Sequence, residues 1–275
     1  MSRGYRFCFA LLLFSLGAPS FAAETAAERG KRVVQEALQA LGGEAFLKMQ
    51  DRAETGRAYS FDKSEVSGLS VATIYTRYVS PRSAAPCELR VSEREAFFKN
   101  AARKDENAAV LYTPEGAWTL TYRGALPFAD ERFRTYEEAT RRNVFYILRC
   151  RLDEPGWEYF SMGTEMVDNR QAEVVEMSDA AGETVRLYFG RDDKLPLRQT
   201  YRHRNPTFKD FDTEVTSFDK YRDAGGGVKW PLDIRRERNG AKIFELYSET
   251  VQINQDLPDN LFTIPGSMKI LPKPK

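Results

Sequence analysis

Residues 157–190 read WEYFSMGTEMVDNRQAEVVEMSDAAGETVRLYFG, and this stretch decides the fold class. Aromatic, β-branched and other apolar residues alternate there with polar ones in short runs, which is typical of half-buried β-strands. The runs cover residues 157–165, 172–179 and 184–190. Turn-forming residues separate them at Asp168-Asn169 and Ala181-Gly182. Strands at this regular spacing predict an antiparallel meander rather than a parallel α/β sheet.

The same pattern continues on both sides of this stretch. Period-two runs predict further strands at residues 59–61, 71–76, 87–91, 96–101, 110–112, 117–122, 197–203, 213–221, 232–238 and 242–253. Turn signals stand between them at residues 113–116, in the glycine run 225–227 and at Asn239-Gly240. Asn239-Gly240 is the clearest hairpin signal in the chain, so we expect one continuous, mostly antiparallel sheet.

Two segments carry a helical period instead. Over residues 25–41 the apolar residues recur at helical spacing, and Gly42-Gly43 supplies the stop. Over residues 130–151, five residues at helical spacing would form one stripe along a helix, and many glutamates and arginines would lie on the opposite face. That stripe consists of Phe133, Tyr136, Thr140, Val144 and Ile147. We expect both helices to lie on the concave side of the sheet, the second either as ordinary packing or as a cover.

The first 22 residues have the order of a secretory signal peptide. Arg3 and Arg6 precede the apolar stretch 7–17, and Ser20-Phe21-Ala22 offers small residues at the two positions read by a signal peptidase. Cleavage after Ala22 predicts a mature protein in the periplasm. Because Cys8 lies inside the apolar stretch rather than before the cleavage site, a lipid anchor is not expected.

Length and charge limit the function classes. Without residues 1–22, which hold two arginines and no acid, 253 residues remain with 39 basic against 40 acidic side chains. This near-neutral balance gives no electrostatic reason to expect nucleic acid or an anionic membrane as a partner. We expect a single domain over residues 23–270, a flexible tail at residues 271–275, and a monomer.

Few residues suggest metal or catalytic chemistry. His203 is the only histidine and sits in a polar, turn-like stretch, so a zinc site with several histidine ligands is excluded. No nucleophile, dinucleotide or phosphate-loop motif occurs, so we expect no enzyme, no catalytic residue and no cofactor. Cys87 and Cys150 predict either a disulfide, as an oxidising compartment allows, or two separately buried thiols.

Three stretches together resemble a known family. The first is Ala40-Leu41-Gly42-Gly43 before a strand after Asp51, and the second joins residues 184–189 to residues 195–198. The third runs from residues 227–231 through Asn239-Gly240 to residues 256–262. Their order resembles the LolA/LolB/LppX lipoprotein-carrier superfamily, also described as outer-membrane lipoprotein-sorting proteins. The resemblance implies a mainly β (α+β) fold, in which a curved antiparallel sheet forms an open half-barrel and helices cover its concave side. It also implies a cavity that binds acyl chains or other lipids without a cofactor.

The leading hypothesis is therefore a periplasmic carrier for lipids or acylated lipoproteins. Our candidates for the cavity lining are aromatic or apolar residues of the strands and of the second helix, each of which could equally serve core packing. They are Trp118, Leu120, Tyr122, Phe133, Tyr136 and Tyr159. An alternative hypothesis is an envelope sensor or protein-interaction domain with the same fold, whose partners are envelope proteins.

Overall fold

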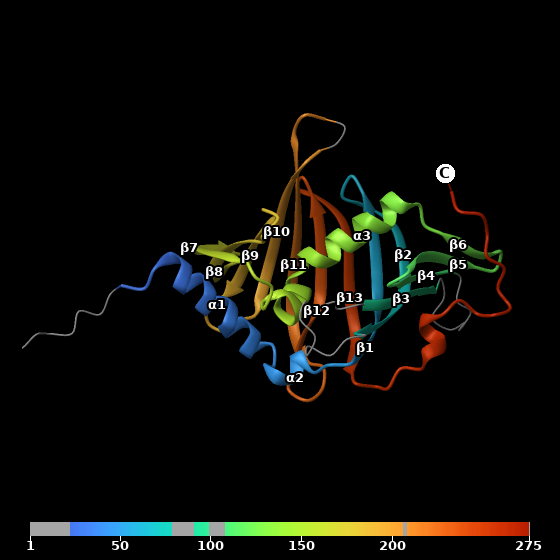
Figure 1. Cartoon of the computed structure of the whole chain (residues 1–275), viewed down its shortest axis with the longest axis horizontal. Helices are drawn as coiled ribbons and strands as arrows, with labels where there is room; N and C mark the ends of the chain where they lie inside the picture. Colours follow the sequence, from blue (N-terminus) through green and yellow to red (C-terminus); the bar gives the residue numbers. More distant parts are fainter. Residues whose placement is uncertain (1–22, 79–90, 99–107, 206–207, 275) are drawn as a thin grey trace, which may run out of the picture.

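The strands of the computed structural model form one antiparallel sheet (Figure 1). The structure describes residues 23–78, 91–98, 108–205 and 208–274. Within them the strand order is β6-β5-β4-β3-β2-β1-β13-β12-β11-β10-β9-β8-β7. The strands are β1 (Asp51–Asp62), β2 (Glu65–Tyr78), β3 (Val91–Phe98), β4 (Ala108–Thr113), β5 (Gly116–Thr121), β6 (Gly124–Pro127), β7 (Glu158–Val167), β8 (Arg170–Ser178), β9 (Thr184–Gly190), β10 (Pro196–Arg204), β11 (Phe211–Asp223), β12 (Lys229–Arg238) and β13 (Ala241–Ile253). The sheet is open, with β6 and β7 at its two edges, which confirms the predicted fold class.

The sheet consists of two meandering arms, β1 to β6 and β7 to β13, joined where β13 pairs with β1. Arg57 lies opposite Tyr247 in this join, and a register shift follows Thr55. At the shift the backbones approach so closely that a Cβ at Gly56 would lie 2.1 Å from the Tyr247 carbonyl oxygen. Only glycine fits there, so residue 56 helps to fix how the two arms meet.

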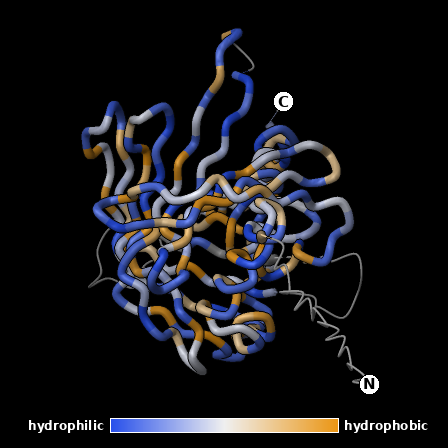
Figure 2. The backbone as a smooth tube through the Cα atoms, turned by 90° about the vertical axis from the view of Figure 1, so that its left-hand side faces the viewer, coloured by the Kyte–Doolittle hydropathy of each residue, from blue (hydrophilic) through white to orange (hydrophobic). Residues whose placement is uncertain are grey.

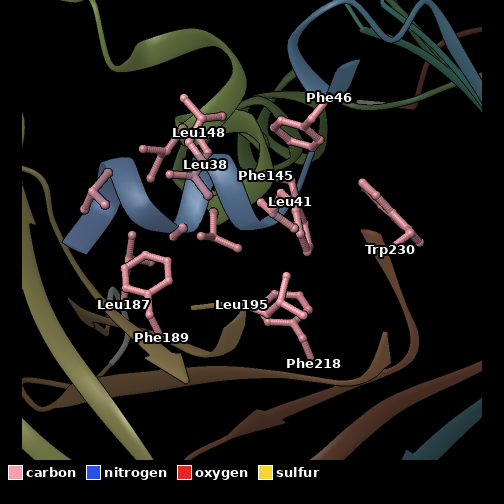
Figure 3. Close-up of a cluster of buried hydrophobic side chains, with 14 of the residues drawn as sticks. Leu38, Leu41, Phe46, Phe145, Leu148, Leu187, Phe189, Leu195, Phe218 and Trp230 are labelled. Carbon is pink, nitrogen blue, oxygen red and sulfur yellow. The ribbon is translucent and has the colours of Figure 1, made fainter. Parts of the chain in front are cut away.

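Helix α1 (Ala26–Ala40) confirms the first predicted helix. Thr25 caps it, since its hydroxyl accepts the Glu28 N–H while the Glu28 carboxylate accepts the Thr25 N–H. One face of the helix is buried against β7, β8 and the segment after residue 143, and apolar side chains of β9 complete the cluster. A short helix, α2 (Glu44–Leu47), follows. Figure 3 shows Leu38 of α1 and Leu41, its C-cap, in one cluster with Leu148, Leu187 and Leu195. This cluster is the main core.

The second predicted helix is divided into three parts. Helix α3 (Asp130–Arg142) ends at Asn143, whose extended backbone interrupts the helical hydrogen bonding. The Asn143 side chain then accepts the Phe145 N–H and starts α4 (Val144–Tyr146), which continues as a π-helix, η1 (Ile147–Arg151). All the buried residues of the predicted stripe lie after this break, at Val144 and Ile147. Only α4 and η1, the two parts after Asn143, therefore belong to the core.

The hydropathy of the residues differs between the interior and the hairpin ends. Figure 2 shows hydrophobic stretches gathered in the interior, while many hairpin ends are hydrophilic. Asn239 and Gly240 both have positive φ in the β12–β13 hairpin, as the sequence signal predicted.

Two predicted strands, 87–91 and 96–101, extend beyond the described residues, because residues 87–90 and 99–101 lie outside them. The described parts of both belong to the single strand β3. At the predicted tail, the Leu271 N–H donates to the Ala125 carbonyl at 2.8 Å, so the tail begins with a residue bound to β6.

Candidate ligand cavity

A cavity of about 320 Å³ lies between the concave face of the sheet and the segment from α3 to η1. Its walls come from strands β1 to β4 and β10 to β13, and Tyr136, Thr140 and Arg142 of α3 line the opposite side. In Figure 1, α3 runs across these strands. The volume is at the lower end of the range of small-molecule sites, roughly 300–1,000 Å³. A site of this size holds part of a lipid, or a short amphipathic molecule.

One wall carries a row of polar side chains across three strands. The register places Arg52 of β1 opposite Thr76 of β2, and Thr76 opposite Glu93 of β3. Arg52 donates to the Thr76 hydroxyl at 3.0 Å, and that hydroxyl donates to the Glu93 carboxylate at 3.1 Å. The Arg52 guanidinium also stacks on the Trp230 ring, 4.1 Å from its centroid. The row is thus rigid, because each member is held by its neighbour.

Glu54 lies beside this row and is almost completely buried. The Ser248 hydroxyl donates to one of its carboxylate oxygens, and Arg52 Nε is 3.3 Å from the other. Burial raises the pKa of Glu54, although Arg52 opposes the shift. Because desolvation outweighs the attraction of Arg52, this carboxyl gains a proton more easily than an exposed glutamate.

Glu95 follows Glu93 on the same face of β3 and also lines the cavity. Burial, and next the charge of Glu93, raise its pKa to about 7, while Arg236 and Arg132 oppose the shift. Among the described residues, no hydrogen bond or ion pair reaches its carboxylate. Glu95 is therefore the carboxylate of this wall that the protein itself does not satisfy.

Two stacked tyrosines attach α3 to this charged wall. The rings of Tyr112 on β4 and Tyr136 on α3 are 3.7 Å apart at an angle of 10°. Burial is the main cause that raises the pKa of both hydroxyls, and the charges of Glu93 and Glu95 add to it. The tyrosines hence remain neutral near neutral pH, and their rings lie close to the carboxylates.

The opposite wall is apolar. Phe145 packs on Phe218 and Trp230, with ring centroids 5.1 and 4.6 Å apart. Ile234 and Leu246 continue this wall along β12 and β13. The lining is therefore amphipathic, whereas the sequence predicted an apolar one.

Arg149 of the π-helix closes the end of the cavity. It is buried, donates to the backbone carbonyls of Phe46 and Met49, and lies 4.3 Å from the centroid of the Tyr78 ring. These bonds tie η1 to α2 and to the segment that follows it. Arg149 thus holds the core part of the predicted second helix in place, while α3 remains outside the core.

One of the six predicted lining residues, Tyr136, lines the cavity. Phe133 stacks on Tyr136, and Tyr159 packs against the main core. Trp118 and Leu120 belong to a small separate cluster with Ile264 and Met268.

Tyr122 lies in the turn after β5 and is 88% exposed. The face shared by Trp118 and Leu120 is covered by the C-terminal segment, because Leu120 packs with Ile264 and Met268. These two side chains therefore lie away from the cavity.

Sequence reasoning missed Arg52, Glu54, Glu93 and Glu95. Each pair is spaced by two residues on a strand, which places its members on one face. That spacing was the available signal. Charged residues in strands normally mark the outer face, however, so nothing in the pattern indicated that these face inward.

Other predictions concern residues with redox or metal chemistry. Cys150 is buried and disulfide-bonded. Cys87 lies outside the described residues, so the pairing of these two cysteines remains a prediction. His203 lies in β10 rather than in a turn, with Nε2 3.5 Å from the Glu214 carboxylate. The described part of the chain contains no cluster of three histidine, cysteine, aspartate or glutamate residues suited to a metal ion.

The predicted signal peptide, residues 1–22, lies outside the described residues. In residues 23–78, 91–98, 108–205 and 208–274, no helix is long and apolar enough to cross a membrane.

Comparisons with known proteins address the fold. No family model matches the sequence, and no curated protein matches it. Among solved structures, a DUF1329 family protein from Desulfovibrio piger is similar, with a TM-score of 0.59 and 14% identity over 85% of this chain and 97% of the other. A putative outer membrane lipoprotein-sorting protein domain from Vibrio parahaemolyticus has a TM-score of 0.56 and 12% identity, and covers 86% of this chain and 97% of its own.

The chain has the same fold as these two proteins, which is called the lipoprotein-sorting fold below after the second of them. The family resemblance seen in the sequence is thus confirmed as a likeness of fold. At such low identities, the lipoprotein-sorting fold by itself does not transfer a ligand, so function has to be argued from the cavity.

Proposed function

We propose that the protein is a periplasmic binding protein that carries a lipid or the acyl chain of a lipoprotein in the cavity beneath α3. The observation that carries the proposal is a cavity of about 320 Å³ covered by a helix that has no buried residue. The lipoprotein-sorting fold supports it. The proposed carrier acts as a monomer and needs no cofactor.

The apolar wall supplies the binding energy. Each methylene group removed from water contributes about 0.8 kcal/mol, so a chain lying along Phe145, Phe218 and Leu246 binds through its apolar area alone. The same free energy opposes release into water. Release therefore requires that the cover moves, and α3 can move at low cost because it has no buried residue.

The cavity can be tested with a fluorescent fatty-acyl ester, which has no free carboxylate, titrated into the mature protein. We expect saturable binding that Ile74→Trp weakens, because Ile74 lines the cavity and the larger ring fills it. Tyr122→Glu is the matched control, since Tyr122 is 88% exposed in a turn away from the cavity. Thermal unfolding of both variants separates lost binding from lost folding. No binding to the wild-type protein, or equal loss in both variants, would contradict the proposal.

The periplasmic location rests on residues 1–22 and needs its own experiment. We expect the protein in the periplasmic fraction with Ala23 as its first residue, which N-terminal sequencing measures. An uncleaved protein that stays in the membrane fraction after a salt wash would contradict this location.

A second candidate function, an envelope sensor or interaction domain, is favoured by the edge strand β7. Phe160, Met162 and Met166 are exposed along it, and an edge strand also offers unpaired backbone groups to another chain. A photoreactive amino acid at Phe160 would test it in cells. A specific cross-linked envelope protein, together with absent probe binding, would favour this function over the carrier.

A further inference from the structure

The carboxylates of the lining are not equally well matched by the protein's own cations. Glu54 is next to Arg52, and Glu214 is 3.1 Å from Arg238. Glu93 receives a hydrogen bond from Thr76. Glu95 lines the same cavity with no hydrogen bond or ion pair among the described residues. Of these four carboxylates, Glu95 is therefore the one that has neither a hydrogen-bond donor nor a cationic partner among the described residues.

The neighbours of Glu95 make this imbalance costly without a ligand. The register places it between Ile74 on β2 and Val110 on β4, both apolar. A carboxylate that leaves water for such surroundings loses solvation that no donor replaces. A cation bound in the cavity would compensate for this lost solvation.

Nearby arginines do not fill this role. Arg52 and Arg149 bind Thr76 and the carbonyls of Phe46 and Met49, respectively. Arg132 and Arg236 stack on the rings of Phe128 and Phe244 and reach Glu95 only through longer-range attraction. None of these four arginines is thus hydrogen-bonded or ion-paired to Glu95.

The aromatic side chains beside Glu95 favour an organic cation. Tyr112 and Tyr136 are stacked close enough to Glu93 and Glu95 for the two carboxylates to raise the pKa of both hydroxyls. Aromatic faces attract ammonium groups, and carboxylates bind them with charge-assisted hydrogen bonds. The apolar wall at Phe145 and Phe218 accommodates an alkyl chain attached to the ammonium.

We propose that the cavity is specific for amphipathic ligands whose polar end is a cationic amine, and that Glu95, supported by Glu93, binds this amine. The proposal rests on the proposed function, since it assigns the polar end of the ligand that the cavity carries. The proposal also predicts which ligands are excluded: a free fatty acid would bring a third carboxylate next to Glu93 and Glu95, and like charges repel. The cavity should therefore reject alkyl carboxylates.

Three probes with the same chain, decylamine, 1-decanol and decanoate, separate the contributions of head group and chain. Their affinities are measured at pH 8 by calorimetry for the wild-type protein, Glu95→Gln and the control Glu65→Gln, an exposed glutamate of β2. We expect the wild type and the control to bind decylamine roughly ten- to a hundredfold more tightly than decanol, as one charge-assisted contact provides. Decanoate should bind most weakly. Glu95→Gln should lose the preference for the amine and keep the affinity for decanol.

The pH dependence gives an independent readout. The groups that face Glu95 are Glu93 on β3, Tyr112 on β4, Tyr136 and Arg132 on α3, and Arg236 on β12. Decylamine, like lysine, stays protonated well above pH 7. Between pH 8 and pH 5.5 we therefore expect its affinity for the wild type to fall as Glu95 takes up a proton, and its affinity for Glu95→Gln to change little.

The outcomes distinguish the two proposals. If decanol binds and decylamine binds no more tightly, or if decanoate is preferred, the amine specificity is overturned while the carrier function stands. If none of the three probes binds the wild type, the proposed function fails and the amine specificity fails with it.

Discussion

Helices α1 and α3 belong to the same layer of the molecule but differ in what holds them. Five residues of α1 are buried, and a complete capping box begins it. Helix α3 has no buried residue, and no side chain caps it at Ala129. Its contacts are made by partly exposed side chains: Tyr136 stacks on Tyr112, Arg132 lies over the Phe128 ring and Arg142 over the Tyr201 ring, and Arg151 donates to the Arg141 carbonyl at 2.9 Å. Both helices are amphipathic, so amphipathicity alone does not tell a structural helix from a cover.

The difference has a consequence for dynamics. Local opening costs little where few apolar contacts are lost, and much where a core is exposed. Helix α3 should open without unfolding of the sheet, whereas α1 should open only in global unfolding. A cover over a cavity has to open without unfolding of the sheet, whereas a core helix has to stay closed until the whole protein unfolds.

The largest effect is expected for Val34→Asp in α1. Val34 is fully buried in the main core, so the new carboxylate has no partner there. We expect a loss of about 3–5 kcal/mol in the free energy of unfolding, measured by urea denaturation. Thr135→Asp, an exposed position of α3, is the matched change and should cost less than about 0.5 kcal/mol. Similar losses in both variants would remove the distinction between the helices.

A smaller effect is expected for Tyr136→Ala, which removes the stack that attaches α3 to β4. An aromatic pair contributes about 0.5–1.5 kcal/mol beyond its buried area. Amide hydrogen exchange should become faster in α3 and remain unchanged in α1. Faster exchange in both helices would mean that α3 is part of the cooperative core.

The next prediction concerns the N-terminal cap of α1 and its contribution to stability. Thr25→Ala removes the hydroxyl that accepts the Glu28 N–H, and loss of such a cap costs about 1 kcal/mol. Chemical denaturation measures this, and Thr25→Ser should restore most of the stability. No loss in Thr25→Ala would show that packing alone holds this end of α1.

The last prediction concerns pH and the wall beneath α3. The folded protein raises the pKa of Glu95 from 4.5 to about 7, so between these values the native state binds a proton that the unfolded state releases. Stability must therefore decrease as pH rises through this window and then level off above pH 7. Thermal unfolding should show a rise in melting temperature from pH 8 to pH 5.5 that is reduced in Glu95→Gln. Equal rises in both proteins would assign the effect to other groups, such as Glu54, whose pKa burial also raises.

Much of the fold could be predicted from the sequence, because its signals are local. The alternation over residues 184–190 became β9, and Asn239-Gly240 became the β12–β13 turn. The helix at residues 25–41 was predicted nearly to its ends. The break at Asn143 was missed, because the stripe from Phe133 to Ile147 keeps helical spacing across it, although only its later part is buried.

The site was predicted less well than the fold. Tyr136 was found because it belongs to an amphipathic stripe, but Trp118 and Leu120 have the same strand pattern and serve a different cluster. Alternation shows that two residues share a face of a strand, but it does not show what that face meets. Glu93 and Glu95 share a face in this sense, and only α3 and the neighbouring strands turn that face into a cavity wall.

The sequence by itself determined the strands, their hairpins, the first helix and the antiparallel order within each arm. These depend on contacts between residues close in the chain, which periodicity and turn residues specify. Only the tertiary structure decided that β13 pairs with β1, where the Gln50 N–H donates to the Asn254 side chain across 204 positions at 2.8 Å. It also decided that Arg52 and Glu95 face inward. Burial and charge pairing depend on which other parts of the chain pack against a face of a strand. The sequence of that strand alone does not specify them.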